Sequence, residues 1–194
     1  MTAIRIGAGA GFGGDRIEPA VELARHGELH HLVFEGLAER TTALAQQARL
    51  ADPDAGYDRM LGERMTAVLP PCRERGVEIV SNMGAANPAA AARPTAAIVR
   101  RLSLSGPKVA CVPGDAAVSA NASLGVEPST EALRAGADVV ITGRVGDPAL
   151  SLAPWCTSSA GRSTTETGWA ATPSSATCRS ARGNSPVVRR RARA

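Results

Sequence analysis

SANASLGVEPSTEALRAGADVVITGRVGDP, residues 119–148, is the stretch that decides the fold. Pro128 suits a first helical turn, where a missing N–H costs nothing, and Gly136 suits the left-handed position that ends a helix. The run at 139–141 is apolar on both faces, which is typical of a parallel strand covered by helices. The stretch therefore predicts a helix, a buried strand and then a polar loop at 142–148. In open α/β sheets, ligands bind beyond such strand ends.

The rest of the body repeats this alternation of strand and helix. Further strands are predicted at 3–8, 30–34, 77–81 and 108–112, and further helices at 15–26, 37–50, 57–69 and 88–104, with a turn at Pro70 and Pro71. The pattern predicts an α/β domain over residues 1–153, built on a mostly parallel, doubly wound (Rossmann-like) sheet of about five strands.

Each predicted strand runs into a loop rich in Gly, Asn or Asp, and four of these loops are expected on one edge of the sheet as a ligand-binding rim. Asp15, Asp115 and Asp147 follow three different strands and are the predicted catalytic carboxylates, as acid and base or around a cation. The predicted substrate-binding residues are Gly11, Gly13, Gly14, Asn82, Gly84, Asn87, Asn121 and Arg144. Arg144 is the expected clamp for a carboxylate or phosphate.

Each of these residues also has a structural interpretation. Asp15 is a natural N-cap for the following helix, Arg144 can pair with a rim aspartate, and the asparagines suit tight turns. The pattern Gly9-x-Gly11-x-x-Gly14 formally matches a dinucleotide fingerprint, with Glu35 near the place of a ribose-binding acid. Asp15 argues against that interpretation because it would repel a pyrophosphate. The sequence assigns no metal and leaves the cofactor unknown.

Residues 154–194 differ in kind from the body. From Cys156 onward the chain has seven arginines, one acidic residue and no Leu, Ile, Phe, Met or Asp. Such a segment buries too little apolar surface to offset chain entropy, so a disordered basic tail is predicted. Codons for Pro154–Gly161, read one register over, can spell Leu-Val-His-Gln-Phe-Gly-Trp, an apolar continuation. We therefore expect the tail to be out-of-frame translation, and we expect no nucleic-acid surface on the body.

The body resembles the N-terminal domain of the acyclic terpene utilisation family (AtuA-like proteins). The matching blocks are GAGAGFGGDR at 7–16, LAERTTALAQQARLADPDAGY at 37–57, VSNMGAANP at 80–88, and SANASLG with EALRAGADVVITGRVGDP within 119–148. The resemblance implies a role in the breakdown of citronellol- and geraniol-type compounds, beside acyl-CoA carboxylase steps. It implies no settled reaction, cofactor or catalytic residue.

Two departures from the family pattern predict an impaired activity. The family carries a longer insert between Asp115 and Ser119, and its domain continues well past residue 155. Whether this chain is an enzyme is therefore left open, with a non-catalytic remnant or a Rossmann oxidoreductase as alternatives. The expected ligand is a small acyl-CoA-like molecule. The absence of an apolar run of about 18 residues predicts no membrane partner, and unpaired cysteines suggest the cytoplasm. An uncovered sheet edge predicts self-association into a homo-oligomer.

Overall fold

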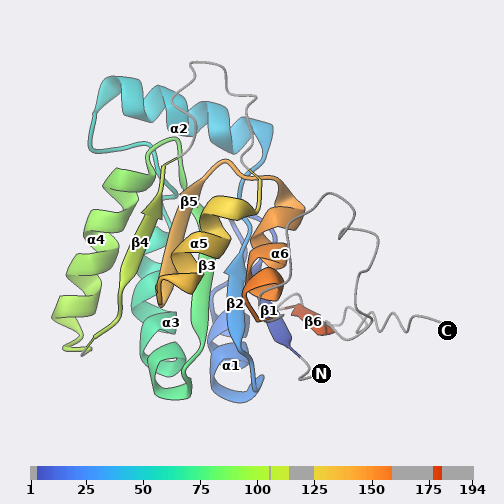
Figure 1. The fold of residues 1–194 in the computed structure, drawn as a ribbon. Helices are drawn as coiled ribbons and strands as arrows, with labels where there is room; N and C mark the ends of the chain where they lie inside the picture. Colours follow the sequence, from blue (N-terminus) through green and yellow to red (C-terminus); the bar gives the residue numbers. More distant parts are fainter. Residues whose placement is uncertain (1–3, 105, 114–124, 159–176, 181–194) are drawn as a thin grey trace, which may run out of the picture.

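The computed structural model describes residues 4–104, 106–113, 125–158 and 177–180, and its centre is a parallel sheet (Figure 1). The sheet order is β4-β5-β3-β2-β1-β6, and every pairing is parallel. The strands are β1 (Arg5–Ala10), β2 (His31–Phe34), β3 (Glu78–Ala85), β4 (Val109–Val112), β5 (Val139–Gly143) and β6 (Thr177–Ser180). The short β6 pairs with the outer edge of β1, and β4 forms the opposite edge.

Helices cover both faces of the sheet, which confirms the predicted α/β class. The first face carries α1 (Glu18–His26), α3 (Leu61–Arg75) and α4 (Pro88–Arg101), and the second carries α5 (Glu127–Arg134) and α6 (Asp147–Ser158). Right-handed crossovers explain this division. The chain moves in one direction across the sheet from β1 to β4, and then returns to β5, so the later helices lie on the other face.

This reversal makes β3 and β5 the strands at the topological switch point. They are neighbours in the sheet, with Ile79 opposite Val139 and Ala85 opposite Gly143. The connection after β3 leads to α4 on the first face, whereas the connection after β5 leads to α6 on the second. In sheets of this kind the crevice for a ligand opens between the carboxyl ends of two such strands.

Alternating strand side chains form two apolar layers. On the first face Phe34 and Ile79 pack against α1, α3 and α4, and on the second face Val80 and Val140 pack against α5 and α6. All four are almost fully buried, and burial of each side chain stabilises the fold by roughly 1.5–3 kcal/mol. The apolar run at 139–141 is buried as expected.

The helix α2 (Glu39–Ala51) has a different position from the others, because it lies across the carboxyl ends of the strands (Figure 1). Only Thr42 and Ala45 are buried along its length. Ala45 packs with Ala85, the last residue of β3, and with Ala86, which follows it. The helix therefore forms a roof over the edge of the sheet where the site was predicted.

Three local predictions need correction. Pro70 and Pro71 lie inside α3 and form no turn, because Pro71 belongs to the buried face of a helix that continues to Arg75. β3 continues to Ala85, so Asn82 and Gly84 stand on a strand and not on the loop beyond it. β1 runs from Arg5 to Ala10, two residues later than predicted. Gly136 ends α5 with φ +80, as predicted. Among the described residues, no helix is long and apolar enough to cross a bilayer.

Candidate functional site

The glycine loop, residues Gly11–Asp15, follows β1 directly and folds back on itself. The carboxylate Oδ2 of Asp15 accepts a hydrogen bond from the amide of Gly11 at 2.8 Å, and the amide of Asp15 donates to the carbonyl of Phe12 at 3.1 Å. The predicted N-cap role of Asp15 is wrong, because α1 starts only at Glu18 and its N-cap is Ile17. Asp15 closes its own loop instead.

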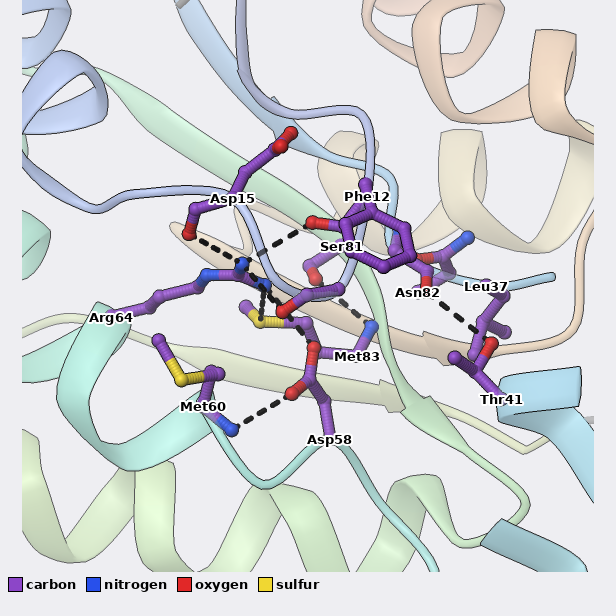
Figure 2. Close-up of polar contacts among 12 residues, drawn as sticks. Phe12, Asp15, Leu37, Thr41, Asp58, Met60, Arg64, Ser81, Asn82 and Met83 are labelled. Carbon is purple, nitrogen blue, oxygen red and sulfur yellow. Dashed lines mark hydrogen bonds and ion pairs between the residues drawn. The ribbon is translucent and has the colours of Figure 1, made fainter. Parts of the chain in front are cut away.

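Arg64 of α3 anchors this loop from below (Figure 2). Its Nη2 donates to the carbonyl oxygens of Phe12 at 3.3 Å, Gly13 at 2.9 Å and Asp15 at 3.1 Å. Its Nη1 donates to Oδ2 of Asp58 at 3.2 Å. The side chain is only 1% exposed, and it is the largest fully buried side chain in the described part of the molecule.

Asp58 connects this anchor to the sheet. Its amide donates to the carbonyl of Met83 on β3 at 2.9 Å, and its Oδ1 accepts from the amide of Met60 at 2.8 Å. Burial raises the pKa of the Asp58 carboxyl, while the Met60 amide and the Arg64 guanidinium act in the opposite direction. Asp58 and Arg64 therefore form a partly desolvated ion pair, and the pKa of the Asp58 carboxyl is raised above its ordinary value.

The sequence reasoning missed Arg64 and Asp58, although the sequence contains a signal for the arginine. Leu61, Met65 and Val68 mark the apolar stripe of α3, and Arg64 falls on that stripe with the spacing of a core residue. A charged residue on an apolar face must find partners inside the protein. That rule would have singled out Arg64 without indicating which loop it binds.

Asn82, in the middle of β3, connects this strand to the tip of β2. Its Oδ1 accepts from the amide of Gly36 at 2.9 Å, and its Nδ2 donates to Oε1 of Glu35 at 3.3 Å. The same Glu35 oxygen accepts from the amide of Leu37 at 3.0 Å. Asn82 is fully buried and both ends of its amide form hydrogen bonds. It therefore holds the tip of β2 against β3 and does not face a ligand directly.

The tips of β1 and β2 also touch. A Cβ at Gly36 would lie 3.5 Å from the Cα of Gly13 and 3.5 Å from Oδ2 of Asp58. The glycine loop, the end of β2 and the end of β3 are therefore one packed unit. Of the predicted binding residues, the structure brings Gly11, Gly13, Gly14 and Asn82 to this unit.

At the switch point the backbones of β3 and β5 approach closely. A Cβ at Gly84 would lie 2.4 Å from the carbonyl oxygen of Thr142 and 2.8 Å from the Cα of Pro88. Ala85 follows with a φ of +46, an unusual value for a residue with a Cβ. Gly84 therefore has a packing role, which is to leave room for β5, and its role in binding a substrate stays a prediction.

Arg144 lies just beyond β5, beneath α2. Its Nη2 is 4.0 Å from Oε1 of Glu39, a partner on α2. The side chain of Arg144 is 30% exposed, and that of Glu39 is 90% exposed. Arg49, further along α2, donates to the carbonyl of Ala86 at 2.7 Å. The ion pair between Arg144 and Glu39 and the hydrogen bond from Arg49 to Ala86 therefore connect α2 to the switch point.

The positions of the other predicted site residues are as follows. Asn87 caps α4 through the amide of Ala90 at 3.3 Å and donates to the carbonyls of Pro53 and Ala55, each at 2.8 Å, so it serves the turn. Asp147 opens α6 and is exposed. Gly11 and Gly14 lie in the glycine loop. Asp115 and Asn121 lie outside the described residues.

Within the described residues, the site offers carboxylates and the guanidinium of Arg144 as groups for a ligand. No group of three or more His, Cys, Asp or Glu side chains with the arrangement of metal ligands occurs in the part of the chain that the structure describes. Asp15 and Glu35 accept hydrogen bonds from the loop and strand tips, and Arg144 supplies a guanidinium at the switch point. Such a set can bind a polar or anionic group and transfer a proton.

Comparison with known proteins gives one result. The model of the family described as "acyclic terpene utilisation family protein AtuA" matches residues 4–119 and 115–159. No curated protein and no solved structure gives a match. The matched ranges include the glycine loop, the Asn82 contacts, the switch point and α6, and together they span most of the chain. The chain therefore belongs to the acyclic terpene utilisation family.

Proposed function

We propose that the rim, the carboxyl edge of the sheet beneath α2, binds a branched acyl compound derived from an acyclic terpene, as its CoA thioester. The observation that carries the proposal is the convergence of four strand tips on one edge. The glycine loop, Gly36 and Asn82 form one packed unit, and the β3–β5 switch point with Arg144 lies beside it. Family membership supplies the acyclic terpene context.

Arg144 is the residue we assign to the anionic part of this ligand. Its contact with Glu39 is long and Glu39 is exposed, so this one contact stabilises the fold little. The planar fork of arginine binds phosphate and carboxylate groups bidentately. Asp15 and Asp147 remain the proposed acid and base, one from the loop after β1 and the other from the first turn of α6.

A dinucleotide oxidoreductase is less well supported by the topology. In a dinucleotide-binding sheet the glycine loop stands at the switch point. Here the loop follows β1, whereas the switch point lies between β3 and β5, with β2 in between. Glu35 also uses Oε1 for Leu37 and Asn82, so the acid expected at the ribose is engaged inside the rim.

A thermal-shift panel with CoA, geranyl-CoA and NAD(H) tests the proposal. We expect geranyl-CoA to raise the melting temperature most, and Arg144→Gln to weaken its binding at least tenfold. Arg93→Gln is the matched control because Arg93 pairs with Asp54 on an exposed surface. A shift with NAD(H) alone would support the oxidoreductase, and equal binding by wild type and Arg144→Gln would refute the role of Arg144.

A second candidate is the non-catalytic remnant, which the composition of the chain from Cys156 onward suggests. The family model matches in two ranges that overlap at 115–119, next to the place where the family insert is predicted to be missing. The panel should be repeated on a protein whose reading frame is restored after residue 153. A shift with that protein and none with this chain would support the remnant. The nucleotide sequence decides the frame directly, because early stops in the alternative frame exclude it.

A further inference from the structure

The glycine loop has little side-chain packing of its own. Three of its five residues are glycine, and the Phe12 side chain is 54% exposed. Gly11 and Gly14 are also exposed. Glycine loses more conformational freedom than any other residue when a chain becomes ordered. The order of this loop must therefore come from hydrogen bonds to its backbone.

Arg64 supplies three of those bonds from a single side chain. Three of the loop carbonyls, those of Phe12, Gly13 and Asp15, accept from its Nη2, and the other end of the fork is fixed by Asp58. Asp58 is itself tied to β3 through Met83. The loop is thus connected to the centre of the sheet through one guanidinium.

The loop also determines where two rim groups lie. Asp15, the proposed acid or base, is part of it, and Gly13 is the residue that touches the tip of β2 at Gly36. If the three carbonyl bonds were lost, both groups would leave their places, and a ligand would have to order the loop on binding. Affinity falls when binding must also order a segment.

We propose that Arg64 is the positioning residue of the rim, which holds the glycine loop against the β2 tip in the arrangement that binds the ligand. This inference rests on the proposed function for the identity of the ligand. Arg64 itself is buried beneath the loop and does not contact the ligand. A lysine would keep the charge and lose the planar fork, so it cannot hold several carbonyls in the same geometry.

The test compares Arg64→Lys with wild type by two measurements. Hydrogen exchange of the amides in residues 11–16 reports loop order in the free protein, and calorimetry with geranyl-CoA reports affinity. We expect exchange in the loop to rise at least tenfold with little change in β3, and affinity to fall at least tenfold. Arg101→Lys is the matched control, because Arg101 donates to Thr66 on an exposed surface away from the loop.

The outcomes separate this inference from the function on which it rests. Unchanged loop exchange in Arg64→Lys overturns it, as does faster exchange with unchanged affinity. If wild type binds no geranyl-CoA, the proposed function fails, while exchange in the free protein still decides whether Arg64 orders the loop. If Arg64→Lys does not fold, Asp58→Asn takes its place, since it loosens the other end of the guanidinium. Loop exchange equal to wild type in Asp58→Asn would then overturn the assignment.

Discussion

The side-chain oxygen of Asn82 lies 2.9 Å from the backbone nitrogen of Gly36, and this single bond ties the end of β2 to the middle of β3. The other end of the same amide donates to Glu35 at 3.3 Å. The Asn82 side chain is fully buried, accepts from a backbone N–H and donates to a carboxylate. This position therefore requires a side chain with an acceptor on one side and a donor on the other.

Asn82→Asp should therefore destabilise the protein in a pH-dependent way. The substitution keeps an acceptor for Gly36, removes the donor to Glu35 and places a second carboxylate beside it. Two close carboxylates raise the pKa of one of them, so the folded state takes up a proton more readily than the unfolded state. The loss should be about 1–3 kcal/mol near pH 8 and smaller near pH 5. Urea unfolding at both values measures it, and a loss independent of pH would contradict the explanation.

Gly84→Ala should destabilise the switch point. The added Cβ would meet the backbone at Thr142 and Pro88, which cannot rotate away, so we expect a loss of about 1–3 kcal/mol. Gly62→Ala in α3 is the matched control, because a Cβ there meets nothing within 4 Å. That change should stabilise the protein by about 0.4–1 kcal/mol. Thermal unfolding compares the two, and equal effects would show that the close approach is unimportant.

Asp58 should make the free energy of unfolding decrease as the pH rises. Its folded pKa lies above the ordinary 3.8 because of burial, so its stabilising contribution is full below about pH 3.8 and is lost as the pH rises through the folded value. The slope from this one group is at most about 1.4 kcal/mol per pH unit. Asp58→Asn cannot titrate, so its stability relative to wild type should improve with rising pH. Urea unfolding of both proteins between pH 4 and pH 8 measures the trend, and a stability difference that does not change with pH would contradict it.

Cys72, Cys111 and Cys156 should differ in reactivity. Burial raises the pKa of the Cys72 thiol to about 12, so at pH 8 only about one in ten thousand of these thiols is ionised. Cys111 and Cys156 also have pKa values raised by burial, but both are only partly buried. In the native protein iodoacetamide should modify them well before Cys72, as peptide mapping by mass spectrometry can show. In urea Cys72 should react at a comparable rate, and labelling of native Cys72 first would contradict its burial.

The sequence was sufficient for the architecture because its strongest signals are local. The β-branched run at 139–141 and the glycine at 136 predict a buried strand and a helix end without reference to the rest of the chain. Pro70 and Pro71 were misread for the same reason. Local preference predicts a turn at two prolines, whereas the packing of Leu69 and Cys72 on either side keeps the helix intact.

The site was only partly predictable, because its geometry depends on contacts between distant residues. The loops rich in Gly, Asn and Asp indicated the correct edge, and Asn82 was among the residues named. Its role was not predictable, since Gly36 is 46 positions away in the chain. Arg64 reaches a loop about 50 positions earlier. Such pairings follow from the winding of the sheet, which no single stretch of sequence contains.

The return of the chain from β4 to β5 has a consequence for biosynthesis. Val109 of β4 pairs with Val139 of β5, and β4 has no other strand neighbour in the described sheet. The ribosome therefore delivers β4 before β5, its strand neighbour in the described part of the sheet. During translation β1, β2 and β3 can assemble in the order in which they emerge, whereas β4 must wait with an unpaired backbone until β5 inserts between it and β3. A pause in synthesis at this point would expose the nascent chain to aggregation.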